Sequence, residues 1–142
     1  MPNASELAES LRHRLEIEQL LAEWAWLIDH GRAEEAASLY ANDAEQTIAG
    51  VTVIGIEAIR EGLRRRAAMT SRTSRHVVSN LKLSGVTAST LEAAWVLTLY
   101  RSDVAARPPT PTLVGDVRDN FRLEGGRWKI RSRQIVPIFA EP

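Results

Sequence analysis

The hydrophobic period of the chain changes near residue 75, and this change constrains the fold more than any other feature. Before it, apolar residues recur at the three- to four-residue spacing of helices. After it, they alternate with polar residues, as in strands with one buried face. Helices followed by strands argue for an α+β fold, with the helices packed on one face of an antiparallel sheet. A length of 142 residues suits one domain, so residues 1–142 are predicted to form a single domain.

Three helical segments are predicted in the first half. The first begins with Ser5 as its N-cap, carries an apolar stripe, and ends at Gly31. A short second helix covers about residues 33–40, a short extended piece follows at 45–49, and the third helix begins after Gly55. The third helix ends in three consecutive arginines, residues 64–66, which could form an anion site. Because cations favour a helix C-terminus, we interpret this run as a solvated helix end.

Four strands are predicted after the change of period, at residues 76–83, 91–101, 113–123 and 127–136. Gly125 and Gly126 are a strong hairpin signal between the last two strands, and a loop with three prolines, 103–111, joins the middle pair. Alternation in the last strand places Trp128 on the buried face and Arg133 on the solvent face.

Charge and composition argue against several classes of function. Eighteen basic residues balance eighteen acidic ones, so we expect no binding to nucleic acid or to an anionic membrane. There is no cysteine, and the three histidines, His13, His30 and His76, lack the spacing of metal ligands, so no metal or cofactor is expected. No apolar stretch approaches the length of a membrane helix. Because the N-terminus also lacks a secretion signal, a cytoplasmic location is expected.

Four passages together resemble one known family. They are Trp24–Asp29 with Gly31 and Arg32, then Gly55–Ile59, then Ser74–Asn80, then Gly125–Ile130. In this order they resemble the SnoaL-like families of the nuclear transport factor 2-like superfamily. The resemblance implies a cone-shaped α+β barrel, in which a strongly curved sheet is closed by the N-terminal helices around an apolar pocket. Relatives include scytalone dehydratase-like lyases, polyketide cyclases, steroid isomerases and the non-catalytic small subunits of ring-hydroxylating dioxygenases, and many form dimers or trimers.

Asp29 and His76 are the candidate catalytic residues. Asp29 lies beside the apolar stripe of the first helix, and its charge opposes the dipole at that helix end. His76 begins a strand, and an imidazole with a pKa of about 6.5 suits proton transfer near neutral pH. A polar helix end and a strand-edge histidine are the structural alternatives. The resemblance implies that an aspartate at position 29 orients a histidine, which makes this pair our acid/base hypothesis.

Five further residues are candidates for binding the substrate. Trp24 stands where dehydratase relatives often carry tyrosine, and an indole cannot act as an acid at neutral pH. Asn80 follows His76 at the period of a strand and is expected at the same cavity. Thr98 and Tyr100 are the polar residues on one face of their strand. Asp119 alternates with apolar neighbours, so an ion pair with an arginine or a place in the pocket would explain it.

Two functions follow from these candidates. In the first, the chain is a cofactor-free lyase or isomerase acting on an oxygenated cyclic hydrophobic substrate. His76 would remove a proton next to a carbonyl, and Trp24, Asn80 or Tyr100 would stabilise the carbonyl oxygen. In the second, it is a non-catalytic ligand-binding protein or an oxygenase small-subunit-like module, because the dehydratase tyrosine and a second pocket histidine are missing. In both cases a small hydrophobic ligand and a homodimer or homotrimer are expected.

Overall fold

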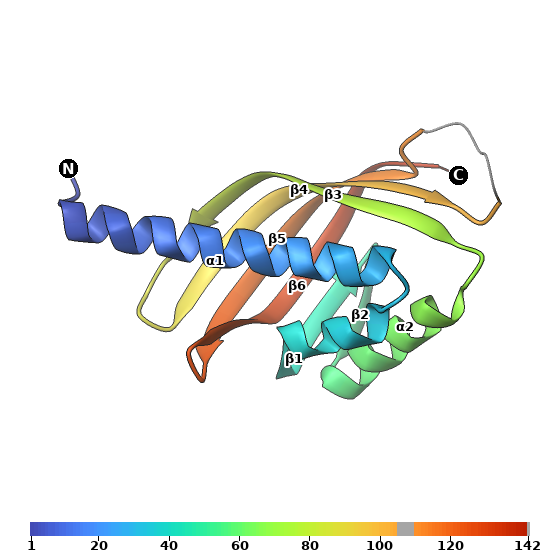
Figure 1. The fold of residues 1–142 in the computed structure, drawn as a ribbon, viewed down its shortest axis with the longest axis horizontal. Coiled ribbons are helices and arrows are strands. Elements are labelled where there is room, and N and C mark those ends of the chain that lie inside the picture. Colours follow the sequence, from blue (N-terminus) through green and yellow to red (C-terminus); the bar gives the residue numbers. More distant parts are fainter. Residues whose placement is uncertain (105–109, 142) are drawn as a thin grey trace.

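The computed structural model describes residues 1–104 and 110–141 and has the α+β architecture predicted from the sequence (Figure 1). The expected loop 103–111 lies partly outside the described residues. The elements are, in chain order, α1 (Ala4–Asp29), the 3₁₀ helix η1 (Ala33–Leu39), β1 (Tyr40–Ile48), β2 (Val51–Ile54), α2 (Ile56–Ala68), β3 (Thr73–Ser84), β4 (Thr90–Ser102), β5 (Leu113–Glu124) and β6 (Arg127–Ala140).

The six strands form one curved, open sheet in the order β2-β1-β6-β5-β4-β3. Neighbouring strands are antiparallel, as expected, except that β1 runs parallel to β6. The four late strands are present. The extended piece at 45–49 belongs to a longer strand, β1, which forms a hairpin with the unpredicted strand β2. Ala49 and Gly50 both have positive φ at that turn, at 49° and 81°, which suits the twist of a two-residue hairpin.

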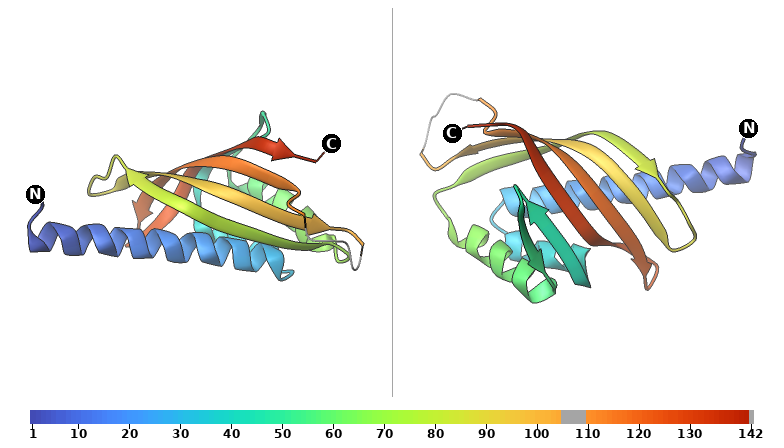
Figure 2. Two further views of the ribbon diagram at one scale, coloured as in Figure 1. Left: turned by 90° about the horizontal axis from the view of Figure 1, so that it is seen from above. Right: turned by 180° about the vertical axis from the view of Figure 1, so that it is seen from behind.

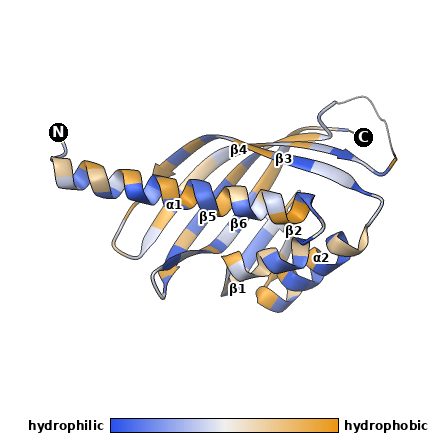
Figure 3. Ribbon diagram, in the orientation of Figure 1, coloured by the Kyte–Doolittle hydropathy of each residue, from blue (hydrophilic) through white to orange (hydrophobic). Residues whose placement is uncertain are grey.

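The helices cover the inner face of the sheet. Helix α1 lies obliquely across the strands, while η1 and α2 pack beside β1 and β2 (Figure 2). The C-terminal half of α1 supplies much of the core, including Leu21, Trp24 and Ile28. Strands β4 and β5 alternate buried and more exposed residues, so one face of the sheet lies toward the helices and the other is uncovered (Figures 2 and 3).

The N-terminal part of α1 extends past the sheet (Figures 1 and 2). Its apolar stripe therefore continues onto an exposed surface, and Leu7, Leu11 and Leu15 are exposed. His13 on this helix is buried, and its ring packs edge-on against Trp128 at a centroid distance of 5.4 Å. Among the residues that the structure describes, none of the helices has the length and apolar character needed to cross a membrane.

Both ends of α1 are fixed by identifiable capping interactions. The helix is capped by Asn3 instead of Ser5, since the Asn3 side chain accepts a hydrogen bond from the Glu6 amide at 2.9 Å and the Glu6 carboxylate accepts one from the Asn3 amide at 2.8 Å. At the other end the Arg32 amide donates to the carbonyl of Leu27, and Gly31 adopts a φ of +79°. This turn fixes the position of the last helical residue, Asp29.

A β-bulge in β3 changes which residues face the core. Ser79 pairs with Val96 and Lys82 with Ala94, so β3 has one more residue than β4 over this stretch. Asn80 takes up the extra position with a φ of 56°, a conformation that asparagine tolerates better than most residues. Asn80 is exposed, and the expectation that it shares the inward face of His76 is wrong.

A second bulge in β6 has the same effect. Phe121 pairs with Ile130 and Asn120 with Ser132, so Arg131 is the extra residue. Beyond it the alternation is reversed, and Arg133 points into the core with an exposed fraction of 2%. The prediction that Arg133 is solvated is therefore wrong.

Candidate active site

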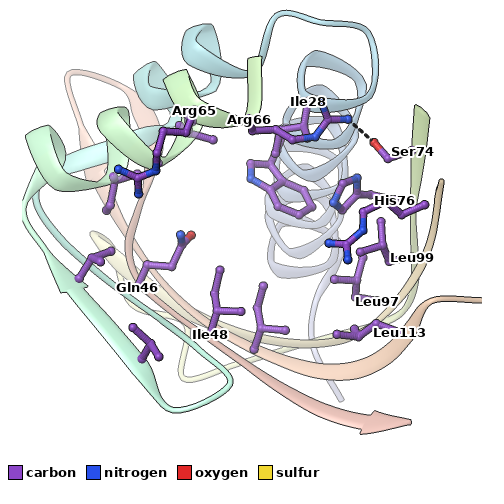
Figure 4. Close-up of a pocket in the computed structure, with 18 of the residues that line it drawn as sticks. Ile28, Gln46, Ile48, Arg65, Arg66, Ser74, His76, Leu97, Leu99 and Leu113 are labelled. Carbon is purple, nitrogen blue, oxygen red and sulfur yellow. Dashed lines mark hydrogen bonds between the residues drawn. The ribbon is translucent and has the colours of Figure 1, made fainter. Parts of the chain in front are cut away.

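A cavity of about 420 Å³ lies between the curved sheet and the two helices (Figure 4). Its floor is apolar and is formed by side chains of β1, β2, β4, β5 and β6. Its upper wall is formed by α1 and α2. The apolar lining consists mainly of Ile28, Ile48, Val51, Val53, Ile59, Leu63, Leu97, Leu99, Leu113 and Ile135. A chamber of this size and polarity suits a small cyclic molecule.

Asp29 and His76 lie side by side at one wall of this cavity. The His76 ring nitrogen Nδ1 is 2.6 Å from Oδ1 of Asp29, and the backbone amide of His76 donates to Oδ2 at 2.7 Å. The hydroxyl of Ser74 donates to Oδ1, also at 2.7 Å. The side chains of Asp29 and His76 are only 4% and 12% exposed. The structure thus brings together the two residues proposed as an acid/base pair.

These contacts define the charge of Asp29 and the tautomer of His76. Burial alone would raise the pKa of Asp29, but the hydrogen bonds from His76 and Ser74 outweigh it and hold the pKa below its ordinary value. An ionised Asp29 accepts a hydrogen bond from Nδ1–H of His76. This leaves Nε2 of His76 as the ring nitrogen able to exchange a proton. His76 itself lines the cavity, whereas Asp29 lies behind it.

Trp24 lines the cavity beside His76. The two rings meet edge to face with centroids 5.1 Å apart, and the guanidinium of Arg133 lies 4.5 Å above the centre of the indole on another side. The indole nitrogen Nε1 is buried and has no hydrogen-bond partner among the described residues. Trp24 therefore forms part of the cavity wall beside His76.

Thr98 and Tyr100 lie on the opposite face of the sheet from the cavity. Thr98 is directly across from Val77 and Tyr100 from Arg75, whereas the cavity residue Leu99 is across from His76. Residues that pair across strands share a face, so the expectation that Thr98 and Tyr100 bind substrate is not supported by their positions. Asn80, displaced by its bulge, also lies outside the lining.

Asp119 is explained by an ion pair in the core. Its carboxylate accepts hydrogen bonds from Nε and Nη2 of Arg133 at 2.7 and 2.8 Å, and from the Trp95 indole at 2.8 Å. Burial would lower the pKa of Arg133, but Asp119 more than compensates and keeps the guanidinium charged. Asp119 does not line the cavity, so its expected role in binding substrate is not supported.

Several polar residues of the cavity were not identified from the sequence. The hydroxyl of Tyr40 donates to Oε1 of Gln46 at 2.8 Å, and both side chains line the cavity. Burial raises the pKa of Tyr40, so its phenol stays protonated. The Gln46 side chain extends toward the interior (Figure 4). Residue 46 fell within the predicted extended piece, but its direction depends on the hairpin and the parallel pairing of β1, which no local pattern revealed.

Arginines are the other group that the sequence interpretation missed. Arg65, Arg66, Arg72 and Arg101 all line the cavity. The interpretation of residues 64–66 as a solvated helix end fits Arg64, which pairs with Glu34 and Glu61. It fails for Arg66, which donates to the Ser74 hydroxyl at 2.7 Å. Within residues 1–104 and 110–141, no three His, Asp or Glu side chains converge as metal ligands do.

Comparison with solved structures gives the same fold. A scytalone dehydratase-like protein from Novosphingobium aromaticivorans is 22% identical, with a TM-score of 0.82 over 92% of this chain and 87% of that protein. Aln2 from a Streptomyces species is 22% identical, with a TM-score of 0.80 over 96% and 94%. A Catenulispora acidiphila protein in complex with S-DNPA is 23% identical, with a TM-score of 0.77 over 89% and 94%. A search of curated proteins returned no match.

The family follows from the sequence match. A model of the SnoaL-like domain matches residues 9–134, a range that contains α1 from its second turn onward, most of the cavity floor and both members of the Asp29–His76 pair. The four passages that resembled this family lie within that range. The chain therefore belongs to the SnoaL-like domain family.

Proposed function

We propose that this protein is a small cofactor-free lyase or isomerase that acts on an oxygenated cyclic hydrophobic substrate. The observation that carries the proposal is the hydrogen-bonded Asp29–His76 pair at the wall of a largely apolar cavity. An imidazole oriented by a buried carboxylate is a common arrangement for a general base. The similar Catenulispora acidiphila protein, whose structure contains S-DNPA, supports binding of a small molecule.

His76 is the proposed base. Its Nε2 takes a proton from a carbon next to a carbonyl group, and the electron pair moves onto the carbonyl oxygen. Asp29 stabilises the imidazolium that forms. The imidazolium then returns its proton, either to another carbon, which completes an isomerisation, or to a departing hydroxide, which completes a dehydration as water is lost. No outside oxidant or reductant is needed in either sequence.

Gln46 is the proposed donor to the carbonyl oxygen. Trp24, Asn80 and Tyr100 were the candidates from the sequence; Trp24 lines the cavity, whereas Asn80 and Tyr100 lie outside its lining. The Tyr40 hydroxyl engages Oε1 of Gln46, which leaves the N–H bonds of the Gln46 amide group available to a ligand. A donor aimed at the developing oxyanion lowers the barrier to proton removal.

Solvent deuterium exchange at the α-carbon of fused-ring ketones such as 2-tetralone tests this proposal. The wild-type protein is expected to accelerate exchange over buffer, and His76→Asn to reduce the acceleration by about 10²-fold or more. This variant keeps an N–H donor for Asp29 and is therefore expected to keep the fold. His30→Ala removes an exposed histidine outside the cavity and is the matched control. Equal exchange rates for wild-type protein and His76→Asn would show that His76 is not the base.

A binding protein without catalysis is the second candidate. It is favoured by Trp24, which stands where dehydratase relatives often carry tyrosine and whose N–H is buried. Calorimetry with the same ketones separates the two functions. Tight binding that is unchanged in His76→Asn, without any exchange, would favour the binding protein.

We infer further that the protein forms a homodimer or homotrimer through the uncovered face of the sheet. Val77, Thr98, Val114 and Phe139 form a row across β3, β4, β5 and β6 on this face. Val77 and Phe139 are 44% and 71% exposed. No helix within the described residues covers this row. An exposed apolar row of this kind is a typical protein interface.

A further inference from the structure

The charge of the cavity is strongly one-sided. Four arginines line it, namely Arg65, Arg66, Arg72 and Arg101, and we refer to them as the arginine rim. No aspartate or glutamate of the described chain is among the lining residues. An otherwise apolar chamber has no structural need for four cations, and the partly buried guanidinium of Arg66 loses hydration there. The imbalance therefore points to a ligand of opposite charge.

Members of the arginine rim differ in how fully they are engaged. Arg72 is committed to Asp103, with contacts of 2.7 and 3.2 Å. Arg66 uses one nitrogen on Ser74. Arg101 makes no side-chain hydrogen bond or ion pair with any described residue, and Arg65 approaches only Glu61, at 3.8 Å. Donors remain on Arg66 and Arg101, therefore, while the charge of Arg72 is balanced.

The position of Arg66 is informative. Its side chain extends from α2 across the top of the cavity and reaches Ser74, on the side that carries the labelled His76 (Figure 4). Burial lowers the pKa of Arg66, and the charges of Arg72 and Arg101 lower it further, while Asp29 and Asp103 oppose this shift. Arg66 thus lies close enough to Arg72 and Arg101 to be repelled by both. An anion between Arg66 and Arg101 would relieve that repulsion and accept charge-assisted hydrogen bonds from both.

We propose that the cavity binds a cyclic hydrophobic acid, with its carboxylate held by Arg66 and Arg101 and its rings on the apolar floor. The inference rests on the proposed function and specifies its substrate class. Ser74 links the two parts of the site, since it accepts from Arg66 and donates to Asp29. The carboxylate therefore lies at the same end of the cavity as His76, and the carbon that loses its proton lies near the acidic end of the substrate.

Titration calorimetry with a tetralone carboxylic acid and its carboxamide tests this inference. The two probes share their rings and differ in charge. Wild-type protein is expected to bind the acid about tenfold or more tightly than the amide at low salt, and added salt is expected to reduce that preference. Arg66→Gln and Arg101→Gln are each expected to remove most of the preference while binding the amide as wild-type protein does. Arg118→Gln, on the uncovered face of β5, is the matched control and is expected to keep the preference.

Each outcome decides the question. Equal affinities for acid and amide in wild-type protein, failure of both to bind, or a preference that survives either cavity variant would overturn the inference. Because the readout is binding, it is independent of catalysis. Deuterium exchange that depends on His76 but shows no preference for the acid would leave the proposed function standing and remove only the carboxylate site. A preference for the acid without deuterium exchange would leave the carboxylate site standing and overturn the proposed catalysis.

Discussion

Asp29 occupies a position that the helix dipole disfavours, because it is the last residue of α1 and carries a negative charge. Three donors, from Ser74 and from the side chain and backbone of His76, make the ionised form favourable there. The resemblance to known relatives identified this residue together with His76. It could not identify Ser74 as a third member, since a serine in a strand has no distinctive pattern.

Loss of the Asp29 charge should have an effect that depends on pH. The pKa of Asp29 is lower in the folded protein than its ordinary value of 3.8, so the carboxylate stabilises the fold above that value. This stabilisation is lost as the pH falls through the folded pKa. We expect Asp29→Asn to lower the free energy of unfolding by about 1–3 kcal/mol at neutral pH.

Urea unfolding of both proteins at neutral pH and in acid measures this difference. The gap between wild-type protein and Asp29→Asn should narrow as the pH falls below the ordinary carboxyl value. A difference in unfolding free energy that stays constant with pH would show that the charge of Asp29 does not contribute to stability.

Strands β3 and β6 show why a correct secondary structure does not guarantee a correct site. The period of two in the sequence predicted both strands, because their apolar residues alternate over most of their length. Each strand contains a bulge whose extra residue, Asn80 or Arg131, reverses the side chains that follow it, and β6 has a second extra residue at Ile138. This reversal moved Asn80 away from the cavity and moved Arg133 into the core.

The buried pair of Asp119 and Arg133 is a consequence of the bulge in β6. Asp119→Leu leaves Arg133 charged and unpaired in the core, and we expect it to lower the free energy of unfolding by about 3–5 kcal/mol. The double variant Asp119→Leu with Arg133→Met removes both charges and should recover much of that loss. Denaturant unfolding of the two single variants and the double variant forms the cycle that measures the coupling. Additive losses would contradict a direct interaction.

At the scale of the whole molecule, the exterior has two apolar regions whose roles can be separated. One is the row of Val77, Val114 and Phe139 on the uncovered face of the sheet, and the other is the exposed leucine stripe of α1. The alternation of the strands predicted that the sheet has two distinct faces. The order of helices before strands also predicted that the helices pack on one face, but it could not show which apolar side chains gather on the other, because that depends on strand order and register.

Phe139→Glu should convert an oligomer to monomers if the uncovered face is the interface. Light scattering coupled to size-exclusion chromatography measures the mass directly. Leu11→Glu places the same charge on the exposed stripe of α1, where the exposed fraction is 60%, and should leave the mass unchanged. The opposite result, with only Leu11→Glu dissociating the assembly, would move the interface to the helix.

The hydrogen bonds around Asp29 also have a mechanical consequence. His76 belongs to β3, an edge strand of the sheet, and its backbone amide donates a hydrogen bond to the Asp29 carboxylate at the end of α1. The contacts that orient the imidazole are therefore also the fastening between the helix and this edge. A cavity ligand that strengthens or breaks the Asp29–His76 contact would tighten or loosen the attachment of β3 to α1. The hydrogen-exchange rate of the His76 amide would measure this change, even for a ligand that is bound but not converted.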